Sequence, residues 1–193
     1  MAIRNLVASM LVVAALLGGC SSSKPGSPYA GVSEAERNPT EADRLNQEAV
    51  AVIDSDPAKA EDLLRRALGA DLYHAPAHNN LGTLLLQRGK LYEAAGEFEW
   101  AKKLMPGHPD PRMNLALTLE VAGRTEEAID TYRTALEVYP EHIATMQALT
   151  RIQVRTGRSD AETKKMLAEI ALRGETEEWR KWAQGRLATS AKP

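Results

Sequence analysis

Residues 75–108, APAHNNLGTLLLQRGKLYEAAGEFEWAKKLMPGH, are followed by residues 109–142, PDPRMNLALTLEVAGRTEEAIDTYRTALEVYPEH, and both stretches are 34 residues long. The same types of residue stand at positions 7, 8, 15, 20, 24, 27 and 32 of both. In the first stretch they are Leu81, Gly82, Gly89, Ala94, Phe98, Ala101 and Pro106, and in the second Leu115, Ala116, Gly123, Ala128, Tyr132, Ala135 and Pro140. A fixed period of this length predicts a helical repeat protein.

Each repeated position has a physical reason. Small residues at positions 8, 20 and 27 let two helices approach closely, and large apolar groups at positions 7 and 24 fill the space beside them. Glycine at position 15 ends the first helix by adopting a left-handed conformation, and proline at position 32 stops the second. This pattern strongly resembles the tetratricopeptide repeat, a helix-turn-helix unit. The resemblance implies an all-α fold, a right-handed α-solenoid of such repeats.

Repeats continue on both sides of these two stretches, but they match the pattern less well. Residues 40–74 are predicted to form a divergent repeat, since Gln47 and Glu48 replace the usual leucine and glycine. Residues 143–173 are predicted to form a degenerate one. Its second helix should pack differently, because the positions for alanine, aromatic and alanine hold Glu162, Met166 and Glu169. Residues 174–188 are expected to form a C-terminal capping helix, as terminal units of a solenoid have only one neighbour.

Capping chemistry sets the expected helix ends. We predict helices over residues 41–54, 57–70, 75–88, 91–105, 109–122, 125–138, 142–156, 159–173 and 176–188. Thr40 with Asp43, and Ser159 with Glu162, have the spacing of capping boxes. Pro57 stands at a first helical position, after Asp56.

The first residues carry an export signal. Arg4 precedes an apolar run over residues 6–17, which at about 12 residues is too short to span a membrane and indicates a signal peptide over residues 1–19. The end of that run, Leu17-Gly18-Gly19-Cys20, resembles the bacterial lipobox. The resemblance implies cleavage before Cys20 and lipidation of its sulfur. Residues 20–39 then have the Pro, Gly and Ser composition of a flexible linker.

Lipidation predicts the location. Several acyl chains on Cys20 would anchor the protein stably to a membrane. Ser21 follows the cysteine where the inner-membrane retention signal of enterobacteria has Asp, so the periplasmic face of the outer membrane is favoured. Removing residues 1–19 takes away only Arg4 and leaves 23 Lys and Arg against 26 Asp and Glu. This balance predicts no nucleic-acid partner, which would call for a strongly basic surface.

The sequence gives no pattern for catalysis. It has no phosphate loop, nucleophile elbow or metalloprotease motif, so no enzyme activity, cofactor or metal site is predicted. His74, His108 and His142 share repeat position 34, but equivalent positions of stacked repeats lie roughly 10 Å apart, too far to share one metal ion. The preferred interpretation is that these histidines are polar residues at the start of each first helix.

The resemblance also implies where a partner binds. In the tetratricopeptide family, positions 2, 5, 9 and 12 of the first helices line a concave groove. The groove residues expected on this basis are Leu45, Ala49, Asn79, Thr83, Leu86, Asp110, Met113, Leu117, Gln147 and Arg151. Such a lining would hold an extended or helical peptide in apolar pockets, with Asn79 and Gln147 bonding its backbone. Arg151 is its only cation, which disfavours recognition of a peptide carboxylate by a cluster of basic residues.

Three tryptophans leave alternatives open. Trp100 marks a partner surface or lies flat along a neighbouring helix, and the second is favoured. Trp179 and Trp182 seal the end of the solenoid or, if exposed, form a docking surface, since tryptophan is a common interface anchor.

Two functions are consistent with these features. The first is a non-catalytic, lipid-anchored periplasmic scaffold for a protein partner, similar in outline to the tetratricopeptide lipoproteins that pilot pilus or secretin assembly. The alternative is a structural envelope lipoprotein that associates with itself through Trp179 and Trp182. Light scattering over a dilution series separates them, since a monomer at micromolar concentration rules out self-association.

Overall fold

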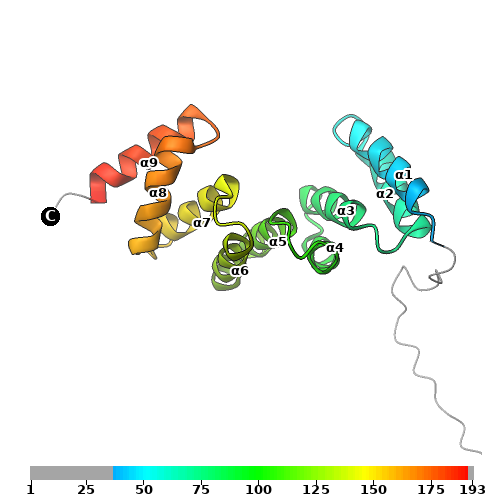
Figure 1. Cartoon of the computed structure of the whole chain (residues 1–193), viewed down its shortest axis with the longest axis horizontal. Coiled ribbons are helices and arrows are strands. Elements are labelled where there is room, and N and C mark those ends of the chain that lie inside the picture. Colours follow the sequence, from blue (N-terminus) through cyan, green and yellow to red (C-terminus); the bar gives the residue numbers. More distant parts are fainter. Residues whose placement is uncertain (1–36, 191–193) are drawn as a thin grey trace, which may run out of the picture. The chain divides into compact units, whose positions relative to one another are not determined.

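The computed structural model describes residues 37–190, and within that range it contains nine α-helices and no strand. The helices follow one another along the chain, each beside the next (Figure 1). Their bounds are α1 Pro39–Val52, α2 Pro57–Ala70, α3 Ala75–Gln87, α4 Leu91–Leu104, α5 Asp110–Val121, α6 Thr125–Val138, α7 Ile143–Arg155, α8 Ala161–Arg173 and α9 Glu177–Ser190. All nine predicted helices are present, with ends within two residues of the prediction. None of these described helices is long and apolar enough to cross a membrane.

The helices pack in pairs, and the pairs stack in chain order. Contacts are most extensive within the pairs α1–α2, α3–α4 and α5–α6, and each second helix also packs on the first helix of the next pair. The core is the seam between these helices, which Ala94, Phe98 and Ala101 of α4 fill without any exposed surface. Burial is therefore spread along the stack, which is typical of a solenoid.

The turns within the pairs depend on glycine. Gly89, Gly123 and Gly157 have φ values of 72°, 77° and 70°, in the left-handed region that other L-residues rarely adopt. The amide of the residue after each glycine bonds a carbonyl of the helix just ended, as Lys90 N does to Leu85 O at 2.9 Å. Glycine at position 15 therefore ends α3, α5 and α7 as predicted.

Helix α1 is shifted relative to the other first helices. Its buried residues are Ala42, Leu45 and Ala49. Leu45 precedes the first residue of α2 by 12 positions, whereas Leu81 precedes the first residue of α4 by only 10. The segment between the buried leucine and the second helix is thus two residues longer in this pair. Leu45 takes the core place that Leu81 has in α3, and the predicted 34-residue register is wrong for α1.

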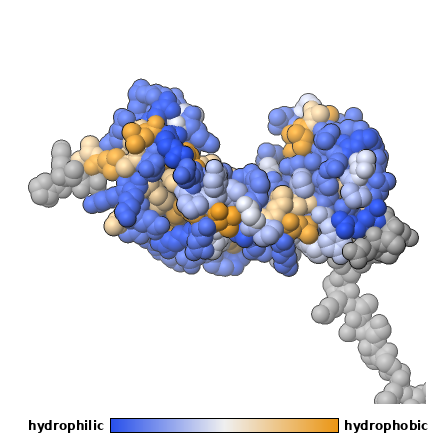
Figure 2. Space-filling view, in the orientation of Figure 1, coloured by the Kyte–Doolittle hydropathy of each residue, from blue (hydrophilic) through white to orange (hydrophobic). Residues whose placement is uncertain are grey.

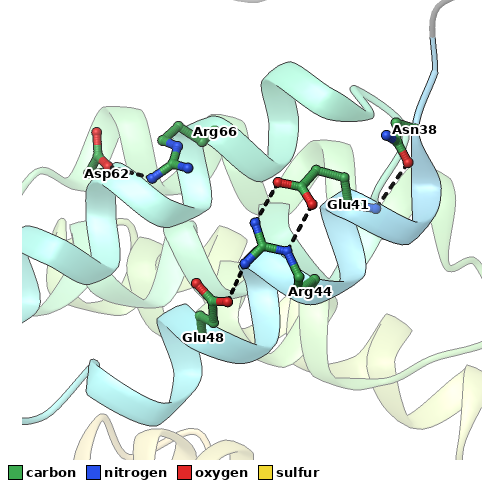
Figure 3. A network of polar contacts seen from close by, with 6 residues as sticks. All are labelled: Asn38, Glu41, Arg44, Glu48, Asp62 and Arg66. Carbon is green, nitrogen blue, oxygen red and sulfur yellow. Dashed lines mark hydrogen bonds and ion pairs between the residues drawn. The ribbon is translucent and has the colours of Figure 1, made fainter.

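Two predicted capping boxes are also wrong. Helix α1 begins at Pro39, and the Asn38 side chain accepts a hydrogen bond from Glu41 N at 3.1 Å, so Thr40 is not its cap (Figure 3). Helix α8 is capped by Asp160, one residue after Ser159. Its carboxylate accepts from Thr163 N at 2.8 Å, and Thr163 Oγ1 accepts from Asp160 N at 3.0 Å. The predicted start of α2, with Asp56 as cap and Pro57 at the first position, is confirmed.

Helix α8 packs differently from α2, α4 and α6, as predicted. Contacts within the pair α7–α8 are less extensive than in the other pairs, and α8 contacts α9 more extensively than α7. Its buried residues are Thr163, Met166, Leu167 and Ile170, while Glu162, at the position that Ala94 holds in α4, is exposed. The buried Thr163, Leu167 and Ile170 have the spacing of Ala94, Phe98 and Ala101 in α4, but one residue later in the repeat. The register of α8 is therefore shifted by one residue, and its glutamate faces water.

Candidate functional site

The first helices of the middle pairs place a set of accessible side chains on one face. We define the A-helix face as the predicted groove residues of α3, α5 and α7 that are half-buried or exposed. They are Asn79, Thr83, Leu86, Asp110, Met113, Leu117 and Arg151. Only Asp110 and Arg151 among them are charged, so this face is mainly uncharged.

Direct contacts link these helices side by side. Asn114 Nδ2 of α5 donates to Asn79 Oδ1 of α3 at 3.1 Å, and Asn80 Nδ2 of α3 donates to Asn46 Oδ1 of α1 at 2.8 Å. The carbonyl oxygen of Asn79 is thus engaged by a neighbouring helix. Its amide nitrogen is the group with which Asn79 can bond the backbone of a partner.

A charged cluster joins α5 to α7. Glu120 accepts hydrogen bonds from Arg151 Nη2 at 3.2 Å, and Arg155 Nη2 lies 3.0 Å from Glu120 Oε1. Tyr132 Oη donates to Glu120 Oε2 at 3.2 Å. Burial and the nearby Glu120 charge raise the pKa of Tyr132 well above its usual range, so the phenol stays protonated and donates. Sequence reasoning missed Arg155, which is a second cation beside Arg151.

Three predicted groove residues do not lie on an accessible surface. Leu45 and Ala49 are buried in the core because of the shift of α1. Gln147 is also buried. With its amide oriented to satisfy both neighbours, it donates to Glu175 Oε2 at 3.1 Å and accepts from Glu175 N at 3.0 Å. These three residues are therefore structural, and Gln147 is not available to bond a partner's backbone.

The histidines make structural hydrogen bonds. His74 Nδ1 accepts from Ala77 N at 3.1 Å and caps α3, while its Nε2 lies 2.8 Å from Asp43 Oδ1. His142 Nδ1 lies 2.7 Å from the hydroxyl of Thr145. His74 therefore has the predicted role at the start of a first helix. No group of three metal-binding side chains occurs among residues 37–190. Cys20 lies outside the described residues.

Trp100 lies flat against a buried histidine. Its ring stacks on His78 with 5.5 Å between centroids and 8° between planes. His78 Nδ1 is 2.6 Å from Glu97 Oε2, and Nε2 is 2.8 Å from Leu72 O. His78 belongs to α3, so the prediction that Trp100 lies flat along a neighbouring helix is confirmed.

Trp179 and Trp182 have a mixed role. Both are half-buried, and their rings meet edge to face, with 5.3 Å between centroids and 89° between planes. Ala183 beside them has no exposed surface, so α9 does cover the end of the stack. The two indoles also line a cavity of about 320 Å³ with Arg151, Thr176 and Glu178. The C-terminal helix is therefore both a cap and part of a recess.

A second recess lies between the second helices α4 and α6. It has a volume of about 550 Å³, and the small residues Ala95 and Gly96 form part of its wall. Tyr92 at its edge is 93% exposed. The space-filling view shows apolar residues in separate patches on a mostly hydrophilic face of the molecule (Figure 2). On this face, the apolar surface is therefore divided into small areas.

Comparison with known families identifies the repeats. The tetratricopeptide repeat family matches residues 51–109 and 93–143. This chain is a tetratricopeptide repeat (TPR) protein. Mouse and human tetratricopeptide repeat protein 8 are each 27% identical to it over 104 residues, or 54% of this chain. The match spans only about a fifth of those relatives, 20% of the mouse protein and 19% of the human one.

Solved TPR structures share the fold. Pseudomonas aeruginosa pilF superposes with a TM-score of 0.70 at 20% identity, covering 79% of this chain and 70% of that one. MamA gives 0.60 at 19% identity, covering 79% and 83%. The first TPR domain of Spaghetti (RPAP3), bound to an HSP90 peptide, gives 0.59 at 17% identity, covering 63% and 98%. The all-α TPR solenoid fold predicted from the sequence is therefore confirmed.

Proposed function

We propose that this TPR protein is a lipid-anchored, non-catalytic scaffold that holds a protein partner at the periplasmic face of a bacterial membrane, favouring the outer membrane. The observation that carries the proposal is the A-helix face, on which accessible and mainly uncharged side chains of α3, α5 and α7 lie on linked helices. Such a face suits an extended or helical segment, which apolar pockets and a few amides can hold.

The comparisons support the binding part of this proposal. The TPR domain of Spaghetti (RPAP3) was solved with an HSP90 peptide bound, and it shares the fold of this chain. The lipobox-like Leu17-Gly18-Gly19-Cys20 supports the anchoring part. Lipidation would keep the scaffold at a membrane, and the predicted linker would let the repeats reach a partner above the headgroups. This linker is shorter than the predicted residues 20–39, because Asn38 caps α1 and Pro39 begins it.

Crosslinking followed by affinity capture from native cells tests the binding part. Leu117→Glu places a charge in the middle of the A-helix face and is expected to abolish capture of the partner. The matched control is Leu172→Glu on α8, because Leu172 is 76% exposed and lies outside the A-helix face. Equal capture by both variants would contradict a role for the A-helix face.

Membrane fractionation with radioactive palmitate tests the anchoring part. The wild-type chain is expected to incorporate label and sediment with membranes, and Cys20→Ser to lose both properties while still crosslinking to the partner. Pilus or secretin assembly is one pathway this partner could belong to, and its identification by mass spectrometry would decide that. A Cys20→Ser chain that remains in the membrane fraction would overturn lipid anchoring.

A further inference from the structure

The cavity between α7 and α9 differs from the rest of the A-helix face. Two indole rings, from Trp179 and Trp182, form its apolar wall, and Arg151 of α7 contributes a guanidinium. Its volume of about 320 Å³ is suited to a single bulky side chain. The cavity therefore combines an aromatic wall with a cation at one end of the A-helix face.

Several contacts fix the turn that positions the two indoles. Glu175 bonds the buried amide of Gln147, and Arg180 Nη1 donates to Gly174 O at 2.7 Å. Thr176 Oγ1 accepts from Trp179 N at 3.4 Å at the start of α9. A Cβ on Gly174 would lie 2.6 Å from Ile170 O, so the backbone at this turn is tightly packed. The cavity wall is thus held before any partner arrives, which lowers the entropic cost of binding.

The charges beside the cavity favour an anion. Arg151 and Arg155 share the single carboxylate of Glu120, whose side chain is 6% exposed, whereas those of the two arginines are 43% and 57% exposed. The groups that a partner meets are therefore guanidinium groups. Glu178, also on the cavity wall, stands in the first turn of α9, where its own backbone amide and the Thr176 hydroxyl lower the pKa of its carboxyl. The positive end of the helix dipole offsets part of its negative charge.

A cationic occupant is disfavoured for a second reason. The guanidinium carbon of Arg186 lies 6.0 Å from the centroid of the Trp182 ring, so an arginine already makes the cation–π contact there. A further cation between the indoles would also approach Arg151. An apolar side chain neither competes with Arg186 nor is repelled by Arg151.

We infer that this cavity, which we call the Trp pocket, binds an extended segment of a partner protein in which a bulky apolar residue is closely followed by an acidic one. The apolar side chain lies against Trp179 and Trp182, and the carboxylate accepts from Arg151 and Arg155. This inference rests on the proposed scaffold function, since it assigns the chemistry of the partner at one end of the A-helix face.

Nuclear magnetic resonance of the full chain tests the inference, because the three tryptophans give three indole N–H signals. The probe is a twelve-residue peptide of glycine and serine with one phenylalanine and, two residues later, one aspartate. Titration to millimolar concentration is expected to shift the signals of Trp179 and Trp182 and not that of Trp100. A peptide with alanine for phenylalanine should bind about tenfold more weakly. One with asparagine for aspartate should bind about threefold more weakly at low salt.

Two variants test whether the difference in binding between the aspartate and asparagine peptides depends on Arg151. Arg151→Gln should make the aspartate and asparagine peptides bind more nearly equally, whereas Arg44→Gln should leave their difference unchanged. Arg44 is a matched control because it is an exposed arginine on α1 that is ion-paired with Glu41 and Glu48 (Figure 3). It is not among the residues that line the Trp pocket. An unchanged Trp100 signal in both variants confirms that the fold is intact.

Two results would overturn the inference: no shift of the Trp179 and Trp182 signals at millimolar peptide, or equal binding of all three peptides. If the partner is captured in a Leu117-dependent way while the peptides fail, the scaffold function stands and the Trp pocket is not its binding site. If the peptides bind as expected but Leu117→Glu captures the partner normally, the Trp pocket stands and the role of the A-helix face fails.

Discussion

His78 and Trp100 stack nearly parallel, with the imidazole enclosed between the indole and the carboxylate of Glu97. Replacing His78 with leucine keeps an apolar group in this fully buried place but removes the contacts to Glu97 Oε2 and Leu72 O. Losing a hydrogen bond to a buried oxygen costs about 1–3 kcal/mol, and more where the oxygen belongs to a carboxylate. We expect His78→Leu to lower the free energy of unfolding by about 2–4 kcal/mol in urea titrations.

The control for this prediction is His108→Leu. His108 has the same side chain, but it is 53% exposed. Its replacement should change stability by no more than about 0.5 kcal/mol, as at most surface positions. Similar losses in the two variants would show that the buried hydrogen bonds of His78 contribute little.

Gly82 and Gly96 provide a matched pair in consecutive helices. A Cβ at Gly82 would lie 2.8 Å from Phe98 Cε1 and 2.9 Å from Cδ1, whereas a Cβ at Gly96 would have no neighbour within 4 Å. The Phe98 ring is fully buried and cannot move aside easily. We expect Gly82→Ala to destabilise the protein by about 1–3 kcal/mol. Gly96→Ala should stabilise it by about 0.5–1 kcal/mol through helix propensity. Thermal unfolding followed by circular dichroism measures both, and effects of the same sign would contradict this account of position 8.

The close approach at Gly82 also explains why so much of the fold was predictable. Small residues are required where these helices approach closely, and glycine is favoured where φ is positive. The sequence of residues 75–142 therefore indicates where the helices end and where they touch. The register of α1 was not predictable in the same way. The segment between Leu45 and α2 is two residues longer than in the next pair, and this places Leu45 in the core. The length of such a segment cannot be read from positions counted in a fixed period of 34 residues.

The candidate site was predictable only in its centre. Positions counted from the repeat place Asn79, Met113 and Leu117 on accessible surface, because α3 and α5 follow the common register. Gln147 has an equivalent position but is buried, since the α8–α9 turn folds back to bond its amide. Such a contact depends on the next helix and not on the repeat itself. The same holds for the meeting of Arg151 with Trp179 and Trp182 in one cavity.

Arg37 and Asp71 give a pH dependence that can be measured. Arg37 donates to both carboxylate oxygens of Asp71, at 2.8 and 3.1 Å, and with the amide of Tyr73 it holds the pKa of Asp71 below its usual value. A carboxyl with a lowered pKa in the folded state contributes stability above its unfolded pKa of about 3.9 and loses it as pH falls through the folded value. Arg37→Gln should therefore cost about 1 kcal/mol at neutral pH.

That difference between wild type and Arg37→Gln should shrink as the pH falls below about 4, because Asp71 becomes protonated in both proteins. Urea unfolding at neutral and acidic pH measures it. Arg66→Gln serves as the control, since Arg66 and Asp62 form an exposed pair on α2 that should contribute nothing measurable (Figure 3). A constant difference at all pH values would assign the effect of Arg37 to packing.

Gln153 of α7 carries a buried amide whose Nε2 has no hydrogen-bond partner among residues 37–190, although its Oε1 accepts from Thr163 Oγ1 at 3.1 Å. An unpaired buried donor costs about 1–3 kcal/mol. Methionine has a similar length and no such donor, and the Thr163 hydroxyl would still reach Asp160 Oδ1 at 2.8 Å. We therefore expect Gln153→Met to raise the free energy of unfolding by about 1 kcal/mol. Thr163→Val should lower it by about 1 kcal/mol, because it removes one arm of the capping box of α8. A loss of stability in Gln153→Met would mean that the bond to Thr163 outweighs the burial of the unpaired amide.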